Sequence, residues 1–144
     1  MGLAKTIDHI GIAVRSIEES LRLYASCLGL ALQTIEQVPD QKTRVAALPV
    51  GEGRLELLES MEEDSPIARF IARRGEGLHH ICFRVDNIVA ELDKLKAAGV
   101  RLIDQQPRRG ASGCLIAFVH PESANGVLIE LSQAAQDHQS APSE

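Results

Sequence analysis

Apolar residues alternate with other residues in two short segments that each contain a histidine. Residues 7–14 read Ile-Asp-His-Ile-Gly-Ile-Ala-Val, and residues 78–85 read Leu-His-His-Ile-Cys-Phe-Arg-Val. Alternation with a period of two, rich in β-branched residues, is typical of strands that bury one face. We therefore predict a strand in each segment, with His9 and His80 on the face opposite the main apolar side chains.

An amphipathic helical pattern follows each of these strands. After the first, Ser16 is a suitable N-cap, and the pattern continues until Gly29. The apolar positions expected to face the core are Ile17, Leu21, Tyr24 and Leu28 in the first helix, and Ile88, Leu92 and Leu95 in the second. A shift of 71 residues superposes His80 on His9 and brings both strand-helix patterns into register, so the chain contains an internal repeat.

Three further strands are predicted in each half of the chain. We expect them at residues 30–38, 43–50 and 54–58, and again at residues 100–103, 114–119 and 127–131. Leu55-Glu56-Leu57 in the first half matches Ile129-Glu130-Leu131 in the second. The predicted fold class is α+β, with two tandem β-α-β-β-β modules that form a curved mixed sheet.

One domain at residues 5–133 accounts for this pattern, with modules at 5–59 and 77–133. The link at 60–76 is expected to be helical, because Ser65-Pro66 is a typical helix start and Arg73-Arg74-Gly75 a typical end. Residues 107–113 are expected to form a loop. Residues 134–144 are polar without an apolar period, so they predict a disordered tail.

Composition narrows the possible functions. The chain has 144 residues and a net charge of −5, without a block of basic residues that would indicate binding to nucleic acid or an anionic membrane. It also has no apolar run of signal-peptide or transmembrane length, which favours a cytoplasmic protein with a small-molecule partner. Its three cysteines are widely spaced and are interpreted as buried thiols.

Strand parity places four potential metal ligands on one face of the predicted sheet. These are His9, Glu56, His80 and Glu130, each opposite the apolar residues of its strand. Two imidazoles and two carboxylates suit a divalent ion such as Co, Mn, Ni, Zn or Fe, and a carboxylate beside the ion can also move protons. Taken singly, each would be interpreted as a core histidine or an exposed glutamate. Their equivalent places in the repeat favour the metal site.

Paired modules with these four residues resemble the vicinal oxygen chelate superfamily, which includes glyoxalase I and the extradiol dioxygenases. Within it, the sequence around the proposed ligands is similar to the methylmalonyl-CoA epimerase family. The similar sequence segments are residues 7–14, 48–53, 55–59, 75–81, 118–121 and 126–131. The resemblance extends over almost the whole predicted domain.

This resemblance implies a metal-dependent epimerase that interconverts the (R) and (S) forms of methylmalonyl-CoA by removing and returning the α-proton. Its metal ligands would be His9, Glu56, His80 and Glu130, and Glu130 and Glu56 would be the catalytic carboxylates. Some members of the family have a glutamine in place of Glu56 and a glutamate at the position of Val45. Since valine cannot transfer a proton, the second acid or base stays open here.

Two alternatives remain, a lactoylglutathione lyase of the glyoxalase I type and a metal-free small-molecule binding protein of the same fold. An extradiol dioxygenase is disfavoured, because its two-histidine, one-carboxylate pattern would leave Glu56 without a role.

Arg108 and Arg109 are either contacts for coenzyme A phosphates or a solvated pair. His79 is predicted to be a hydrogen-bonded packing residue that points away from His80. An exposed strand edge favours a homodimer.

Overall fold

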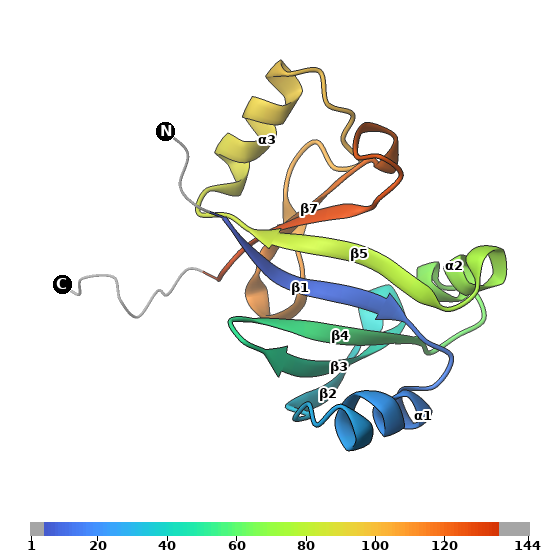
Figure 1. The fold of residues 1–144 in the computed structure, drawn as a ribbon. Helices are drawn as coiled ribbons and strands as arrows, with labels where there is room; N and C mark the ends of the chain where they lie inside the picture. The colour runs from blue at the N-terminus through green and yellow to red at the C-terminus, as the bar shows by residue number, and fades with distance from the viewer. Residues whose placement is uncertain (1–4, 136–144) are drawn as a thin grey trace. The chain divides into compact units, whose positions relative to one another are not determined.

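The computed structural model describes residues 5–135 of the chain (Figure 1). They form two compact units. Ile7–Cys82 make up the N-terminal unit, and the described residues from Phe83 onward, with Lys5 and Thr6, make up the C-terminal unit. Across these described residues, no helix combines the length and apolar character needed to cross a membrane.

The strands of the N-terminal unit lie in the order β2-β3-β4-β1-β5. Their bounds are β1 Thr6–Ala13, β2 Thr34–Val38, β3 Thr43–Val50, β4 Gly53–Ser60 and β5 Gly77–Arg84. The hairpin of β3 and β4 turns at Gly51, where φ is +58°, a left-handed value that glycine adopts without steric cost. Strand β1 runs parallel to β4, and this register sets Gly11 beside Glu56 and His9 beside Arg54.

The first helix is shorter than predicted and changes its winding. Helix α1 spans Ile17–Leu21 and is capped by Ser16 as expected, but Arg22–Cys27 continue as the π-helix η1. There the backbone N–H of Leu28 donates to the carbonyl of Leu23, five residues earlier. The wider turn rotates Leu28 off the apolar face and leaves it 59% exposed. The prediction of Leu28 as a core position is therefore wrong.

Strand β2 starts later than predicted. The expected strand began at residue 30, but the backbone N–H of Leu30 donates to the carbonyl of Tyr24 and completes the exit from η1. Regular pairing with β3 begins only at Thr34. The hydrogen bond that ends the helix therefore holds Leu30 in the helix exit, although the apolar pattern alone predicts that it starts a strand.

The strand predicted at residues 100–103 is replaced by one isolated bridge between Leu102 and Val119. The side chain of Asp104 accepts a hydrogen bond from the backbone N–H of Phe118 at 2.8 Å, so this donor is satisfied by a side chain. Regular pairing is made instead by Arg108–Arg109, the short strand β6, inside the segment predicted as a loop.

Helix α2, Pro66–Arg74, lies in the link predicted to be helical. The Ser65 hydroxyl caps it by accepting from the backbone N–H of Ala68 at 3.0 Å, and Gly75 ends it with φ of +79°. Ile67 packs against Ala13 and Leu58 of the sheet. Because Ala13 and His9 share one face of β1, α2 covers one end of the face that carries His9.

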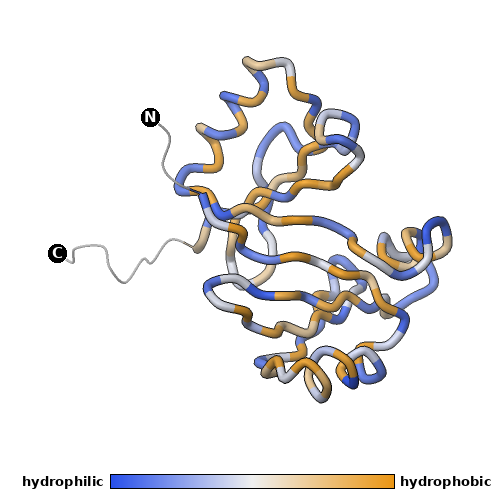
Figure 2. The backbone as a smooth tube through the Cα atoms, in the orientation of Figure 1, coloured by the Kyte–Doolittle hydropathy of each residue, from blue (hydrophilic) through white to orange (hydrophobic). Residues whose placement is uncertain are grey.

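The two faces of the N-terminal sheet carry different apolar clusters. Two neighbouring residues of β4 belong to different clusters. Leu57 packs with Ile17 of α1, and Leu58 packs with Ile67 of α2. In Figure 2 apolar colour follows the strands, while the segment before α2 is hydrophilic. Neighbouring residues of the strand therefore pack against different helices, as the predicted alternation requires.

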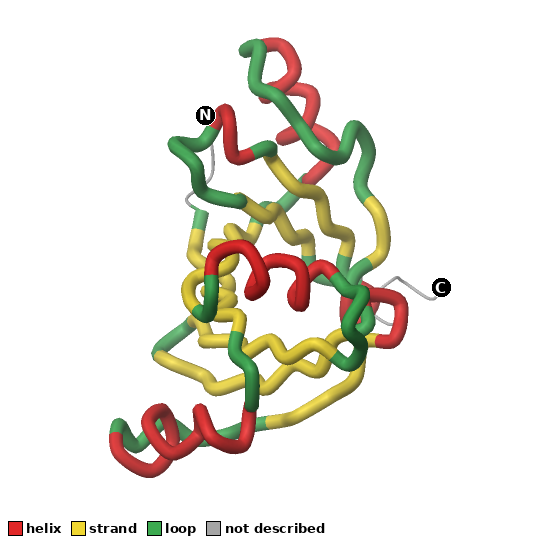
Figure 3. Tube along the Cα trace, turned by 90° about the vertical axis from the view of Figure 1, so that its right-hand side faces the viewer, coloured by secondary structure: helices red, strands yellow, loops and turns green. Residues whose placement is uncertain are grey.

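The strand-helix pattern repeats along the chain, since α3 follows β5 as α1 follows β1. The C-terminal unit contains α3 Ile88–Ala97, β6, β7 Leu115–Val119 and β8 Ile129–Gln133, in the strand order β8-β7-β6. Figure 3 shows the helices in red and the strands in yellow. Short 3-10 helices at Pro39–Gln41, Ala111–Gly113 and Pro121–Ser123 complete the described elements of the two units. The predicted α+β fold class, with two β-α-β-β-β modules, is confirmed. Beyond residue 135, the predicted tail lies outside the described residues.

Candidate metal centre

His9 and His80 meet on the N-terminal unit with their rings almost perpendicular. Their Nε2 atoms lie 3.0 Å apart, the ring centroids lie 5.0 Å apart, and both residues are buried, with exposed fractions of 6% and 7%. Glu56 of β4 joins them, since its Oε1 lies 3.4 Å from Nε2 of His9. The three side chains can each offer one ligand atom within 4.8 Å of the other two. The structure thus brings together three of the four predicted ligands.

These distances fit one divalent metal ion. Nitrogen and oxygen ligands of such ions lie about 2.0–2.2 Å from the metal, so two ligands in adjacent positions are about 3 Å apart. The separations of 3.0 and 3.4 Å around His9 Nε2 agree with this value. Two imidazoles and a carboxylate form the borderline ligand set that divalent transition metals prefer.

Glu130, the fourth predicted ligand, lies on β8 of the C-terminal unit. It is buried, with an exposed fraction of 7%, and the strand register pairs it with Phe118 of β7. A buried carboxylate needs a charged or hydrogen-bonding environment. Its place among the metal ligands stays a prediction.

Asp8 supports His9 from behind. Its Oδ2 lies 2.8 Å from His9 Nδ1, and both residues are buried. An ionised carboxylate can only accept, so the hydrogen is on Nδ1 of His9 and the lone pair is on Nε2. This is the tautomer that presents Nε2 to an ion.

His79 has the equivalent position next to His80. Its Nδ1 lies 2.9 Å from Nδ1 of His80, and its ring packs against Phe70 of α2 with centroids 4.9 Å apart. The prediction of a hydrogen-bonded packing residue is confirmed. The expected direction is wrong, because the ring turns toward His80 instead of away. Each histidine of the cluster is thus supported at Nδ1 by the residue that precedes it.

Arg54 is a further member of the site that the sequence analysis did not identify. Its side chain lies beside Glu56 and Asp8, with the shortest distances at 2.8 and 3.2 Å. Burial lowers the pKa of Arg54, but the attraction of the Glu56 and Asp8 carboxylates outweighs it and raises the pKa above its usual value. The available signal was strand parity, which places residues 54 and 56 on one face.

Gly11 lies directly against the ring of His80. A Cβ atom at this position would be 2.4 Å from Cε1 and 2.7 Å from Nδ1 of His80. Such distances are far below van der Waals contact, so the imidazole can occupy its place only because residue 11 has no side chain.

We expect Gly11→Ala to displace the His80 ring and weaken metal binding by about ten-fold or more, the scale seen when ligand support is lost. Calorimetric titration of the metal-free protein with Co²⁺ measures the affinity. Gly51→Ala, a glycine whose Cβ would meet open space, is the control for loss of a glycine, although its left-handed φ adds some strain. Unchanged affinity in Gly11→Ala would show that His80 is not a ligand in this position.

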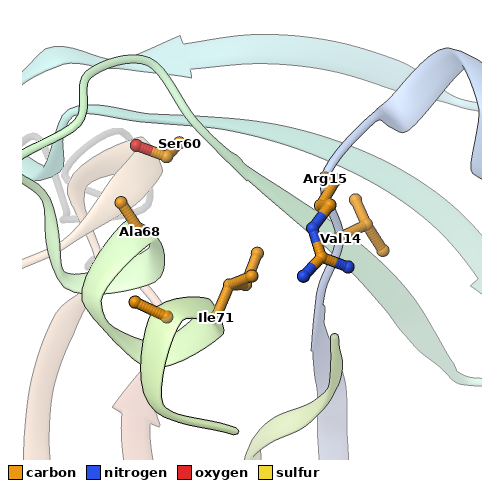
Figure 4. A pocket seen from close by; sticks show the side chains of 6 residues that line it. Val14, Arg15, Ser60, Ala68 and Ile71 are labelled. Atoms are coloured by element: carbon orange, nitrogen blue, oxygen red, sulfur yellow. The ribbon is translucent and has the colours of Figure 1, made fainter. Parts of the chain in front are cut away.

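A shallow groove of about 310 Å³ lies at the other end of strands β1 and β4 (Figure 4). It is lined by Val14, Arg15, Ser60, Ala68, Ile71 and Ala72. Arg15 is held at its rim, since its backbone N–H donates to Glu76 at 2.7 Å. Val14 is five positions further along the chain than His9, about 16 Å in an extended strand, so the groove is separate from the histidine cluster.

The family of this chain follows from a match to known sequences. Residues 8–118 match the Glyoxalase/Bleomycin resistance protein/Dioxygenase superfamily. The chain belongs to this superfamily. The resemblance predicted from the repeated modules is therefore confirmed.

Relatives within the superfamily resemble the chain over most of its length. The uncharacterized protein YqjC of Bacillus subtilis is 44% identical over 131 residues, covering 91% of this chain and 94% of YqjC. The ethylmalonyl-CoA/methylmalonyl-CoA epimerase of Cereibacter sphaeroides is 36% identical over 129 residues, covering 88% of this chain and 96% of that enzyme. Epimerases are thus among its full-length relatives.

A solved structure shows the same likeness. A variant of the Streptomyces coelicolor methylmalonyl-CoA epimerase in complex with 2-nitronate-propionyl-CoA is 36% identical and has a TM-score of 0.84. The match covers 90% of this chain and 94% of that one. The likeness therefore holds for fold as well as sequence.

Val45, where some superfamily members have a glutamate, is partly buried and packs against apolar side chains. It packs into the cluster of Ala13, Leu58 and Ile67, and its strand partner on β4 is Leu58. Position 45 therefore supplies packing and offers no proton donor or acceptor.

Arg108 has partners within the C-terminal unit. Its Nε lies 3.1 Å from Asp104 Oδ1, and its guanidinium lies over the Phe118 ring, 5.5 Å from the centroid. Arg109 is exposed. A role of either residue in binding coenzyme A phosphates stays a prediction.

Proposed function

We propose that this chain is a metal-dependent epimerase that interconverts the (R) and (S) forms of methylmalonyl-CoA. The observation that carries the proposal is the buried cluster of His9, Glu56 and His80, whose ligand atoms have the spacing of one metal site. Relatives that match 88% and 89% of this chain and are named as epimerases of this substrate support the choice of reaction.

The α-carbon of methylmalonyl-CoA lies between a thioester and a carboxylate, so removing its proton leaves negative charge on the carbonyl oxygens. A divalent ion held by His9, Glu56 and His80, with Glu130 as the proposed fourth ligand, would supply positive charge that stabilises this electron pair. Asp8 and His79 hold the two imidazoles in orientation from their Nδ1 sides.

Epimerisation requires that the C–H bond breaks on one face of the α-carbon and re-forms on the other. We propose that the Glu130 carboxylate takes the proton on one face and becomes a carboxylic acid, while a second acid delivers a proton to the opposite face. Glu56 is the other candidate carboxylate, and it also serves as a proposed ligand. General acid-base catalysis of this kind contributes about 10²–10⁴-fold to rate.

The proposal is tested by incubating the full chain with methylmalonyl-CoA in heavy water, after chelation and after addition of Co²⁺, Mn²⁺, Ni²⁺, Zn²⁺ or Fe²⁺. We expect deuterium to appear at the α-carbon only with the ion present. A glutathione hemithioacetal serves as the second substrate, and its conversion without exchange of methylmalonyl-CoA would favour a lactoylglutathione lyase. Absence of both reactions, together with no metal uptake at micromolar concentration, would favour a binding protein.

We propose that the protein works as a cytoplasmic homodimer. Strand β2 ends the strand order of the N-terminal unit, and most of its residues are exposed. The backbone edge of such a strand offers donors and acceptors that a second copy can pair with.

A further inference from the structure

Arg54 reaches the candidate metal centre from within β4. Residues 54 and 56 point to the same face of the strand, and the register of β1 and β4 places Arg54 beside His9. Its side chain is one-third exposed, while those of Glu56 and Asp8 are largely buried. The guanidinium therefore lies at the edge of the site with its donors directed toward two buried carboxylates.

Both donors that Arg54 directs to Glu56 converge on the same oxygen. Nε lies 2.9 Å and Nη2 lies 2.8 Å from Oε2 of Glu56. The other oxygen, Oε1, is the one that lies 3.4 Å from His9 Nε2. Arg54 thus fixes the rotation of the carboxylate and presents Oε1 alone to the histidines.

Arg54 also acts on His9, through Asp8. Its Nη2 lies 3.2 Å from Oδ2 of Asp8, the same oxygen that accepts from His9 Nδ1 at 2.8 Å. Nη2 is also 3.4 Å from His9 Nδ1, but both atoms are donors in this tautomer, so the orienting contact is the one through Asp8. One guanidinium thereby orients two of the three clustered ligands.

We propose that Arg54 is a positioning residue that presents Glu56 as a one-oxygen metal ligand and holds His9 through Asp8. This inference rests on the proposed metal-dependent function. The competing explanation is a salt bridge that only stabilises the sheet. Such a bridge would leave metal affinity unchanged in a variant that still folds.

The chain offers a matched control for that explanation. Arg44 of β3 and Glu59 of β4 face each other across the same sheet, with Nη1 3.2 Å from Oε1 and both side chains about one-quarter exposed. Neither residue contacts His9, Glu56 or His80 in a described interaction. Arg44→Met therefore removes an arginine-glutamate pair of the same sheet without touching the proposed ligands.

The experiment is Co²⁺ titration of the metal-free full chain, followed by calorimetry and by the visible absorption of the bound ion. We expect Arg54→Met to bind about 10–100-fold more weakly, the usual cost of losing a residue behind a ligand, and to change the absorption bands. Arg44→Met should stay within about three-fold of wild type. Arg54→Lys should recover part of the loss, because it keeps the charge but not the two-donor geometry.

Each outcome decides one point. If the wild-type chain takes up no Co²⁺, the proposed metal-dependent function fails. If wild type binds Co²⁺ and folded Arg54→Met binds it equally well with the same spectrum, the function stands and the inference about Arg54 is overturned. If circular dichroism shows that Arg54→Met is unfolded, the test uses Arg54→Lys instead. Wild-type Co²⁺ affinity and a wild-type spectrum in Arg54→Lys would then overturn the inference.

A double variant tests the route through Glu56. In a Glu56→Gln background, Arg54→Met should cost clearly less affinity than it does alone, because the carboxylate that it orients is already gone. Equal losses in both backgrounds would show that Arg54 does not act through Glu56.

Discussion

Replacing His80 with alanine is expected to reduce Co²⁺ affinity by at least about a hundred-fold and to abolish metal-dependent exchange of the α-proton of methylmalonyl-CoA. The reason is geometric, since Nε2 of His80 is 3.0 Å from Nε2 of His9, and its loss leaves only one of the two clustered imidazoles. Loss of a residue behind a ligand already costs about 10–100-fold, so loss of the ligand itself should cost more. Calorimetric titration and the heavy-water assay measure the two effects separately.

His120→Ala is the matched control for this change. His120 lies on the C-terminal unit, where its ring accepts a hydrogen bond from the backbone N–H of Glu122. The variant should bind Co²⁺ with wild-type affinity. Wild-type affinity in His80→Ala as well would contradict the metal centre, provided that circular dichroism shows the variant to be folded.

The repeat explains why most of the cluster could be predicted from sequence. Strand parity is a local property, so His9, His80 and Glu56 could be assigned to a face without knowledge of the fold. The offset of 71 residues then related the two histidines, and the structure places their Nε2 atoms in contact. Local periodicity combined with internal symmetry was sufficient for these positions.

Arg54 and Asp8 depend on information that no local pattern contains. The partnership of Arg54 with His9 follows from the register of two parallel strands that are 45 residues apart in sequence. In an alternating strand Asp8 belongs to the face opposite His9, but its carboxylate turns back to the neighbouring imidazole. Register and side-chain rotamer are set by the packed structure, so the supporting residues appear only there.

The errors in secondary structure have a similar origin. Leu28 fits a regular helical period, yet a π-turn rotates it into solvent. The segment around Leu102 fits a strand, yet the backbone N–H of Phe118 donates its hydrogen bond to the carboxylate of Asp104. In each case one specific hydrogen bond overrides an apolar pattern that is otherwise correct.

Replacing Glu130 with glutamine is expected to lower the rate of α-proton exchange by about 10²–10⁴-fold while metal binding changes far less. The amide of glutamine keeps an oxygen that can ligate an ion, but it cannot take up a proton at neutral pH. The heavy-water assay gives kcat for the loaded enzyme, and Co²⁺ titration confirms that the ion is still bound. A kcat within a few-fold of wild type would exclude Glu130 as a proton carrier.

Glu56→Gln is the matched change at the other carboxylate, and it separates the two roles. If Glu56 serves only as a ligand, its amide oxygen can replace the carboxylate oxygen that faces His9, and exchange should persist within about ten-fold of wild type. Loss of exchange in Glu56→Gln with retention in Glu130→Gln would reverse the assignment. Loss of exchange in both variants, with the ion still bound, would mean that the two carboxylates handle the proton on opposite faces of the α-carbon. Glu56 would then be the second acid, a role that Val45 cannot fill.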